Sequence, residues 1–326
     1  MSNSEESPTV ENWSEYSDAL VDRGRLTVWV SEEALQDWKA DREPQQGAQW
    51  IFTDRAIETC LQIKMVYGLT LQETEGFVES LFRFMGLDDL PVPDYTTLSK
   101  RQGDLDIDLR ASSKSSPMHL VIDSTGLKVY GEGEWKKRIH GKQKRRTWRK
   151  LHLAVDSETG LITAATLTEN TSSDASQVET LLEETRSEGS EAECSKTTLD
   201  RIGADGAYDT FDVYEIIESY GATPVIPPQK NARIKKHGNS SGPPLPRDEA
   251  IRYIRAHGRG RNKWKRVHGY HRRSLAETAV YRFKGLMGRF VEARTWENER
   301  TEVRLEAKTL NRMTRSGMPE TTPTGV

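Results

Sequence analysis

Four residues in the last third of the chain, Tyr270, Arg273, Glu277 and Lys284, set a single carboxylate among basic side chains. If this stretch is helical, at about 100° per residue, their spacing places all four within an arc of about 60°. The opposite face of that helix is apolar and carries Leu275, Ala279, Phe283 and Leu286. The helix should therefore pack on a core and present its polar stripe to a site or to solvent.

Two aspartates upstream follow apolar, strand-like segments. Asp123 comes after "LVI" and before "STG", and Asp205 stands in "IGADGAYDT", where Gly206 allows an immediate turn. Ligand sites of open α/β sheets gather at such strand ends. Asp123 could equally be a strand-end residue that caps a turn. We expect Asp209 to be an N-cap, and Asp156 to belong to a "DSETG" turn.

Three carboxylates near basic segments suit a hard divalent cation. Mg²⁺ prefers oxygen ligands and is commonly held by a few carboxylates together with substrate phosphates. Two such ions, about 3.5–4 Å apart, can stabilise the attacking and leaving oxygens of a phosphoryl transfer. The pattern thus predicts two bound Mg²⁺ ions, with Mn²⁺ as a substitute. Bound metal would also offset the repulsion between the three acids and a negatively charged polymer.

The charge is distributed unevenly along the chain. Residues 1–115 hold 11 Lys and Arg against 22 Asp and Glu, whereas residues 116–326 hold 36 against 28. Residues 136–150 contain nine basic residues and no acid, and residues 230–273 contain fourteen against two acids. This pattern indicates nucleic acid as the partner, although solvated loops can have the same composition.

Aromatic residues within the basic segments favour the nucleic-acid interpretation, because aromatic rings can stack on bases. Candidate DNA-binding residues in these segments are Lys142, Lys144, Arg145, Arg146, Arg149, Lys263, Lys265 and Arg266. Trp148 and Trp264 are interleaved with them.

The elements that must position these residues fall into two groups. Residues 1–48 read as a polar, acidic arm with a short strand at "RLTVWV", and residues 49–115 read as helical. Gly68 should end the first of three helices, Thr70 and Glu73 should form a capping box for the second, and the third should run through "YTTLSKRQ". The set fits a helix-turn-helix DNA reader, with Lys100 and Arg101 as DNA contacts, and equally a generic helical packing module.

From residue 116 onward, strands and helices alternate. The expected order is three strands, a helix, a strand, a helix, a strand, a long basic excursion and a final long helix. This order describes an α/β domain with a mixed sheet. Cys60 and Cys194 form no metal or disulfide pattern, and no apolar run is long enough to cross a membrane. We therefore expect a soluble, intracellular protein with no membrane contact.

Tyr270, Arg273, Glu277 and Lys284 match the signature Tyr-x2-Arg-x3-Glu-x6-Lys, and the chain therefore resembles the DDE transposases of bacterial insertion sequences. The resemblance is to the insertion-sequence-five family, whose catalytic domain has an RNase H-like fold. "VIDSTGLKVYGEGEW", "RTWRKLHLAVD", "ADGAYDT", "LNRMTRSGMP" and "DYTTLSKR" also look like that family, so the resemblance covers roughly residues 50–318.

The resemblance implies roles for individual residues. Asp123, Asp205 and Glu277 would be the catalytic acids and Mg²⁺ ligands, while Tyr270, Arg273 and Lys284 would lie at the DNA. The implied activity is Mg²⁺-dependent cleavage of double-stranded DNA at terminal inverted repeats, followed by transfer of the 3′-hydroxyl ends into target DNA. Synapsis of two ends implies a homodimer or a larger assembly on DNA. The resemblance also implies a cytoplasmic, nucleoid-associated protein of a prokaryote.

The predicted architecture is thus an RNase H-like mixed-sheet domain at 116–318 with a basic insertion at 229–268. It is preceded by an acidic arm at 1–48 and a mainly helical, helix-turn-helix-like domain at 49–115, and followed by a tail at 319–326. Two alternatives stay open: an RNase H-like Mg²⁺ nuclease without strand transfer, and an inactive DNA-binding relic or repressor.

Overall fold

The computed structural model describes residues 10–40, 51–109, 117–130, 147–186, 198–236 and 243–320. The chain divides into two compact units. The first, here called the helical unit, comprises Met1–Asp106 and Lys308–Val326, and the second, the sheet unit, comprises Ile107–Ala307. Helix α13 (Trp296–Ser316) supplies residues to both. Among the described residues, no helix has the length and hydropathy needed to cross a membrane.

The helical unit contains the three helices expected from the sequence. They are α4 (Asp54–Tyr67), α5 (Leu71–Phe84) and α6 (Tyr95–Arg101). Gly68 ends α4 in the left-handed conformation, where a glycine has no steric cost. Thr70 and Glu73 form the reciprocal capping box at the start of α5, as predicted.

The segment expected to be a polar arm also holds helices: α1 (Trp13–Arg23), α2 (Leu26–Trp29) and α3 (Glu32–Gln36). The predicted strand at residues 25–30 is therefore wrong. The apolar residues of this segment are anchored individually: Trp29 and Trp38 are each 1% exposed, and Trp38 donates its indole N–H to the carbonyl of Pro91 at 2.8 Å. Burial of these two tryptophan side chains outweighs the β-propensity of the short apolar run at residues 25–30.

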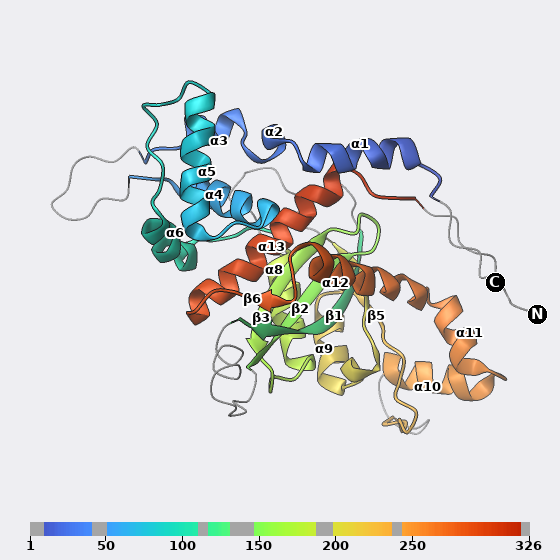
Figure 1. Cartoon of the computed structure of the whole chain (residues 1–326). Coiled ribbons are helices and arrows are strands. Elements are labelled where there is room, and N and C mark those ends of the chain that lie inside the picture. The colour runs from blue at the N-terminus through green and yellow to red at the C-terminus, as the bar shows by residue number, and fades with distance from the viewer. Residues whose placement is uncertain are drawn as a thin grey trace, which may run out of the picture. The chain divides into compact units, whose positions relative to one another are not determined.

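The sheet unit is built on a mixed sheet with strand order β3-β2-β1-β4-β5, and β6 pairs with the end of β1 (Figure 1). The strands are β1 (Met118–Val129), β2 (Trp148–Asp156), β3 (Ile162–Glu169), β4 (Leu199–Gly203), β5 (Thr223–Val225) and β6 (Phe290–Val291). β1 is antiparallel to β2 and parallel to β4. This arrangement is that of an RNase H-like fold, so the predicted fold class is confirmed.

The expected turn between β2 and β3 is present. Asp156 accepts hydrogen bonds from the Glu158 amide at 3.0 Å and from the Thr159 hydroxyl at 2.6 Å. Both carboxylate oxygens are thereby used locally, which confirms a turn role for Asp156.

Helices cover the two faces of the sheet. Leu120 and Ile122 of β1 belong to a buried cluster with residues of α8 (Val178–Arg186) and α9 (Phe211–Ser219). Side chains alternate along a strand, so Val121 and Asp123 lie on the other face, where α12 (Ser274–Leu286) packs against β1 and β2.

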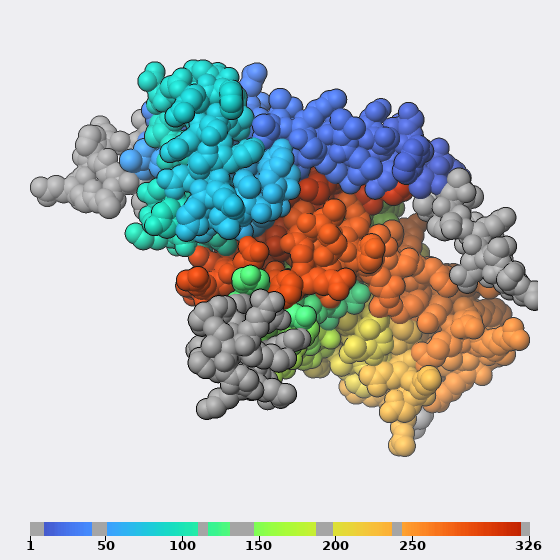
Figure 2. Space-filling model, in the orientation of Figure 1, coloured from blue at the N-terminus to red at the C-terminus, as the bar shows by residue number. Residues whose placement is uncertain are grey.

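The basic insertion is folded, which the sequence did not reveal. It contains α10 (Pro246–Ala256) and α11 (Gly260–Val267), and Trp264 of α11 packs with Val225 of β5. In Figure 2 these helices (orange) lie against the segment that precedes them (yellow). At the turn between them a Cβ on Gly260 would lie 2.0 Å from the carbonyl oxygen of Ile254, so this position requires glycine.

Candidate active site

Asp123 and Asp205 are brought together by strand register. β1 and β4 are parallel neighbours, and Val121 pairs with Gly203, so each aspartate lies two residues beyond that pair. Because parallel strands advance in step, the two aspartates lie at neighbouring positions where β4 ends. The sequence prediction that both lie at strand ends is borne out for Asp205, whereas β1 continues for six residues past Asp123.

Local hydrogen bonds orient these two side chains. Asp123 accepts from the amide of Ser124 at 2.9 Å. Asp205 is the N-cap of the short 3₁₀ turn η3 (Gly206–Tyr208) and accepts from the amide of Ala207 at 2.8 Å. In each case one oxygen is held by the backbone, which fixes the carboxylate while leaving acceptor capacity for a further partner.

Glu277 faces the aspartates from the first turn of α12. The expected single helix is divided: Tyr270–Arg273 form a 3₁₀ turn, η4, and the α-helix begins at Ser274. The predicted arc is therefore approximate. The buried face of α12 consists of Ala276, Ala279 and Phe283. Ala279 and Phe283 were expected there, but Leu286 is exposed.

Arg273 lies among the three acids. Its guanidinium is 2.9 Å from Glu277 and 3.8 Å from Asp123. Burial lowers the pKa of Arg273, but the charges of Tyr270, Asp123, Glu277 and Asp205 outweigh this effect and raise it overall. Arg273 thus keeps its positive charge and partly neutralises the acids. Its Nε is buried without a hydrogen-bond partner, so the guanidinium is incompletely satisfied in this position.

The carboxylates also influence one another. Burial raises the pKa of Asp123, and the negative charges of Asp205 and Glu277 raise it further, against the lowering effects of the Ser124 amide and Arg273. A cation beside Asp123 would therefore favour its ionised form.

The donor chemistry of this cluster fits a hard cation, since it offers carboxylate oxygens alone. The acids nevertheless lie farther apart than the ligands of one metal ion. Among the described residues, no three acidic, histidine or cysteine side chains lie close enough together to hold one ion. The acids surround an arginine instead.

Tyr270 lies beside the cluster, and Lys284 lies further along α12. Burial raises the pKa of the Tyr270 hydroxyl, and Lys265 lies over its ring at 4.8 Å from the centroid. Burial, followed by the charge of Arg289, lowers the pKa of Lys284. Both residues are half-buried in the sheet unit.

The other predicted DNA-binding residues have different environments. Arg149 lies 2.6 Å from buried Glu299 and stacks on Trp296, and Arg101 is buried against Asp54 and the carbonyl of Phe52. These contacts give both arginines structural roles and argue against a DNA contact. Lys100, Lys263 and Arg266 are exposed and Lys265 is half-buried. Lys142, Lys144, Arg145 and Arg146 lie outside the described residues.

One ion pair close to the site was missed by sequence reasoning. Asp209, expected to be an N-cap, is buried and binds Arg247 of the insertion through two hydrogen bonds of 2.7 and 2.9 Å. It also accepts from the amide of Gln229 at 2.8 Å. The N-cap of α9 is Thr210 instead. The only sequence signal was an acid placed four residues after Asp205 and followed by Thr210, which can itself act as an N-cap.

Comparison with known proteins identifies the sequence family. Residues 114–312 match the family described as "Transposase DDE domain", and residues 21–132 match a second family of the same description. The first match covers more than half of the chain and includes all three acids. Among solved structures, the chain is similar to a piggyBac transposase in a synaptic complex with hairpin DNA, determined by cryo-electron microscopy. The identity is 12% and the TM-score 0.38, over 95% of this chain and 78% of that chain.

Proposed function

Because the chain belongs to the transposase DDE-domain family, we propose that it is an insertion-sequence transposase of the insertion-sequence-five family. In this proposal it cleaves DNA at terminal inverted repeats and transfers the 3′-hydroxyl ends into target DNA. The observation that carries the proposal is the convergence of Asp123, Asp205 and Glu277 on one arginine, from two parallel strands and a facing helix.

Asp123, Asp205 and Glu277 would hold Mg²⁺. A divalent cation bound there would supply Lewis-acid stabilisation for the charge on the phosphoryl oxygens. The chain's own residues would orient the DNA. Arg273 presents a planar fork that matches a phosphate, so it could exchange its carboxylate contacts for phosphate contacts. Lys284 would supply a point charge to the DNA backbone.

Displacement of Arg273 is central to this mechanism. Its present partners are the acids, its Nε is unsatisfied, and its distance to Asp123 is long. The oxygens of a DNA phosphate could accept hydrogen bonds from the N–H groups of Arg273, including the one that lacks a partner. The acids released from the arginine could then take up metal, which couples DNA binding to assembly of the site.

A plasmid carrying the gene's own flanking DNA tests the proposal. Wild-type protein and Glu277→Gln are incubated with it in Mg²⁺ or Mn²⁺, and all cut and joined products are mapped. We expect cuts confined to the two ends, joined 3′ ends, and a loss of both by about 10³-fold in the variant. Glu179→Gln, which changes an exposed acid on α8, is the matched control and should retain activity.

Other outcomes would decide between the remaining candidates. Cuts at the ends without joined products, lost in Glu277→Gln, would indicate a nuclease. Tight DNA binding with no cleavage in either metal would indicate a DNA-binding relic. Sedimentation of the protein with end DNA would test the proposed dimer or larger assembly.

A further inference from the structure

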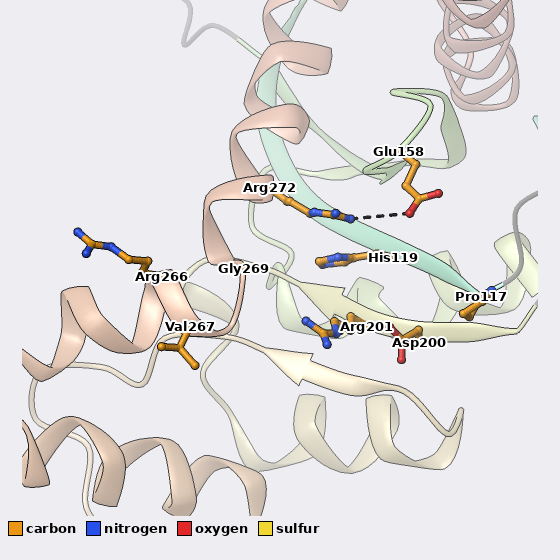
Figure 3. Close-up of a pocket in the computed structure, with 9 residues that line it drawn as sticks. All are labelled: Pro117, His119, Glu158, Asp200, Arg201, Arg266, Val267, Gly269 and Arg272. Carbon is orange, nitrogen blue, oxygen red and sulfur yellow. Dashed lines mark ion pairs between the residues drawn. The ribbon is translucent and has the colours of Figure 1, made fainter. Parts of the chain in front are cut away.

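A pocket of about 520 Å³ opens in the sheet unit beside the first residues of β1 and β4 (Figure 3). His119 enters it from β1, Arg201 from β4 and Arg272 from η4, and the close-up shows these three side chains succeeding one another along one side. Arg266 of α11 also lines the pocket, and its acidic residues are Glu158 of the β2–β3 turn and Asp200. None of these residues belongs to the carboxylate cluster.

Arg201 and Arg272 are only loosely paired with the acids of this pocket. Arg272 lies 3.9 Å from Glu158, and Arg201 lies 3.4 Å from Asp200. Charge-assisted hydrogen bonds between such groups are about 2.7–2.9 Å long, so both contacts are weak. All four side chains are about half exposed, with 47–51% of their surface accessible. The N–H groups of the two guanidinium groups thus remain available to a ligand.

His119 adds a neutral group between the two arginines. Its side chain is buried, and burial together with the charges of Arg272 and Arg201 lowers its pKa to about 4. The ring is therefore uncharged at neutral pH and can donate one hydrogen bond. Burial is the main cause of the lowered pKa of His119, and a bound anion would offset the smaller contribution of the two arginines.

We propose that this pocket binds a backbone phosphate of DNA, a few base steps away from the phosphate that reaches the carboxylates. Guanidinium groups donate hydrogen bonds and accept none, so they require an acceptor-rich anion. The volume exceeds that of one phosphate and leaves room for the attached sugar-phosphate chain. The choice of DNA over a free nucleotide rests on the proposed function.

The geometry of β1 and η4 links the pocket to the carboxylate cluster. His119 and Asp123 are four residues apart on β1, so they lie on the same face of the sheet, about 13 Å apart along the strand. The adjacent residues Arg272 and Arg273 reach the pocket and the carboxylates respectively. A separation of about 13 Å corresponds to about four base steps along a duplex. One DNA backbone could therefore cross both sites.

Metal-free binding experiments test this assignment. Arg201→Gln, Arg272→Gln and the double variant are titrated with a labelled duplex of about 30 base pairs that contains the element's end, over a range of salt concentrations. The control is Arg186→Gln, which removes an exposed arginine from α8 on the other face of the sheet. Thermal melting of each variant verifies that it is folded.

Each single pocket variant should weaken duplex binding by about five- to tenfold and reduce the slope of log K against log salt by about one. The control should change binding less than twofold. Equal effects of pocket and control variants would overturn the proposal. So would micromolar binding of inorganic phosphate or a nucleoside triphosphate that Arg272→Gln abolishes while the duplex salt slope stays unchanged, because the pocket would then be a small-anion site.

The result is independent of catalysis. A protein that binds duplex through Arg201 and Arg272 but never cuts it would overturn the proposed function and leave the phosphate site intact. A protein that cuts correctly, with cutting and binding insensitive to both substitutions, would support the proposed function and overturn the phosphate site.

Discussion

Two aspartates of the sheet unit meet arginine in contrasting ways. Asp209 is fully buried and shares two short hydrogen bonds with Arg247, and a backbone amide completes its acceptor set. Asp123 is partly exposed, and its oxygen lies 3.8 Å from Arg273, whose Nε has no partner. The first pair is saturated, whereas the second retains unused hydrogen-bonding capacity.

The two pairs therefore have different roles. The pair Asp209–Arg247 is a structural anchor, here called the anchor, whereas Asp123–Arg273 belongs to a site that can take a ligand. A saturated buried pair gains nothing from a ligand, and opening it exposes an uncompensated charge to the protein interior. An unsaturated, partly exposed pair such as Asp123 and Arg273 can exchange partners at low cost. Asp209 thus fixes the insertion to the chain just after Asp205, and Asp123 stays available for chemistry.

Breaking the anchor should have the largest effect on stability. Arg247→Met leaves Asp209 buried without its cation, so the free energy of unfolding should fall by about 3–5 kcal/mol. Urea unfolding followed by tryptophan fluorescence measures this. The double variant Asp209→Leu/Arg247→Met removes both charges and should recover most of the loss. A cost below about 1 kcal/mol for Arg247→Met would contradict the anchor.

A third acid–arginine pair sharpens the comparison. Arg304 lies 2.8 Å from Glu184, yet burial of this carboxyl raises its pKa to about 7, and Asp108 adds to the rise. Between pH 4.5 and 7 the folded state binds more protons than the unfolded state, so stability should fall as pH rises through this window. The loss should be about 2–3 kcal/mol.

Glu184→Gln tests this pH dependence. Its stability should decline less than that of the wild type between pH 5 and pH 8, measured by urea unfolding at each pH. His119 and His152, whose pKa values burial lowers to about 4, act oppositely and reduce stability below pH 6.5 in both proteins. Parallel curves for variant and wild type would refute the assignment to Glu184.

Removing the arginine of the unsaturated pair should change stability by less than about 1 kcal/mol. Arg273→Gln leaves the acids without their internal cation, so Mn²⁺ should bind about three- to tenfold more tightly in calorimetric titration. DNA cleavage should nevertheless decline, because the phosphate loses its fork. Weaker Mn²⁺ binding in Arg273→Gln would show that the arginine organises the acids rather than competes with metal.

The smallest effect is expected at the edge of the anchor. Gln229→Ala removes a 3.3 Å side-chain bond to the carbonyl of Gly206 but keeps the backbone amide that binds Asp209. The cost should be below about 1 kcal/mol, because the lost bond is long and exposed. A larger loss in thermal melting would mean that the side chain, and not Arg247, carries the anchor.

Local chemistry made much of the fold predictable. The capping box at Thr70, the left-handed Gly68 and the turn around Asp156 each depend on residues within four positions of one another. The succession of strands and helices along the chain could be inferred because apolar runs end at turn residues. Asp123 and Asp205 were proposed as site residues from their places after apolar runs, and Glu277 from the family signature.

Partners distant in the chain could not be read in the same way. Arg149 and Glu299 are 150 residues apart, and Arg247 and Asp209 are 38 apart, so nothing local distinguishes these arginines from ones that face DNA. Arg101 was assigned to DNA for the same reason. The 3₁₀ turn at Tyr270–Arg273 escaped because its composition also suits an α-helix.

The pairing of β1 with β4 bears on how the protein is made. β1, β2 and β3 are sequential neighbours, so they can associate soon after they leave the ribosome, whereas Met118 meets Leu199 only after a much longer segment has emerged. Asp123 is thus placed first, Asp205 later and Glu277 last. Arg273 precedes Glu277 by four residues, so the nascent chain completes the acidic cluster only once its own counter-ion is present.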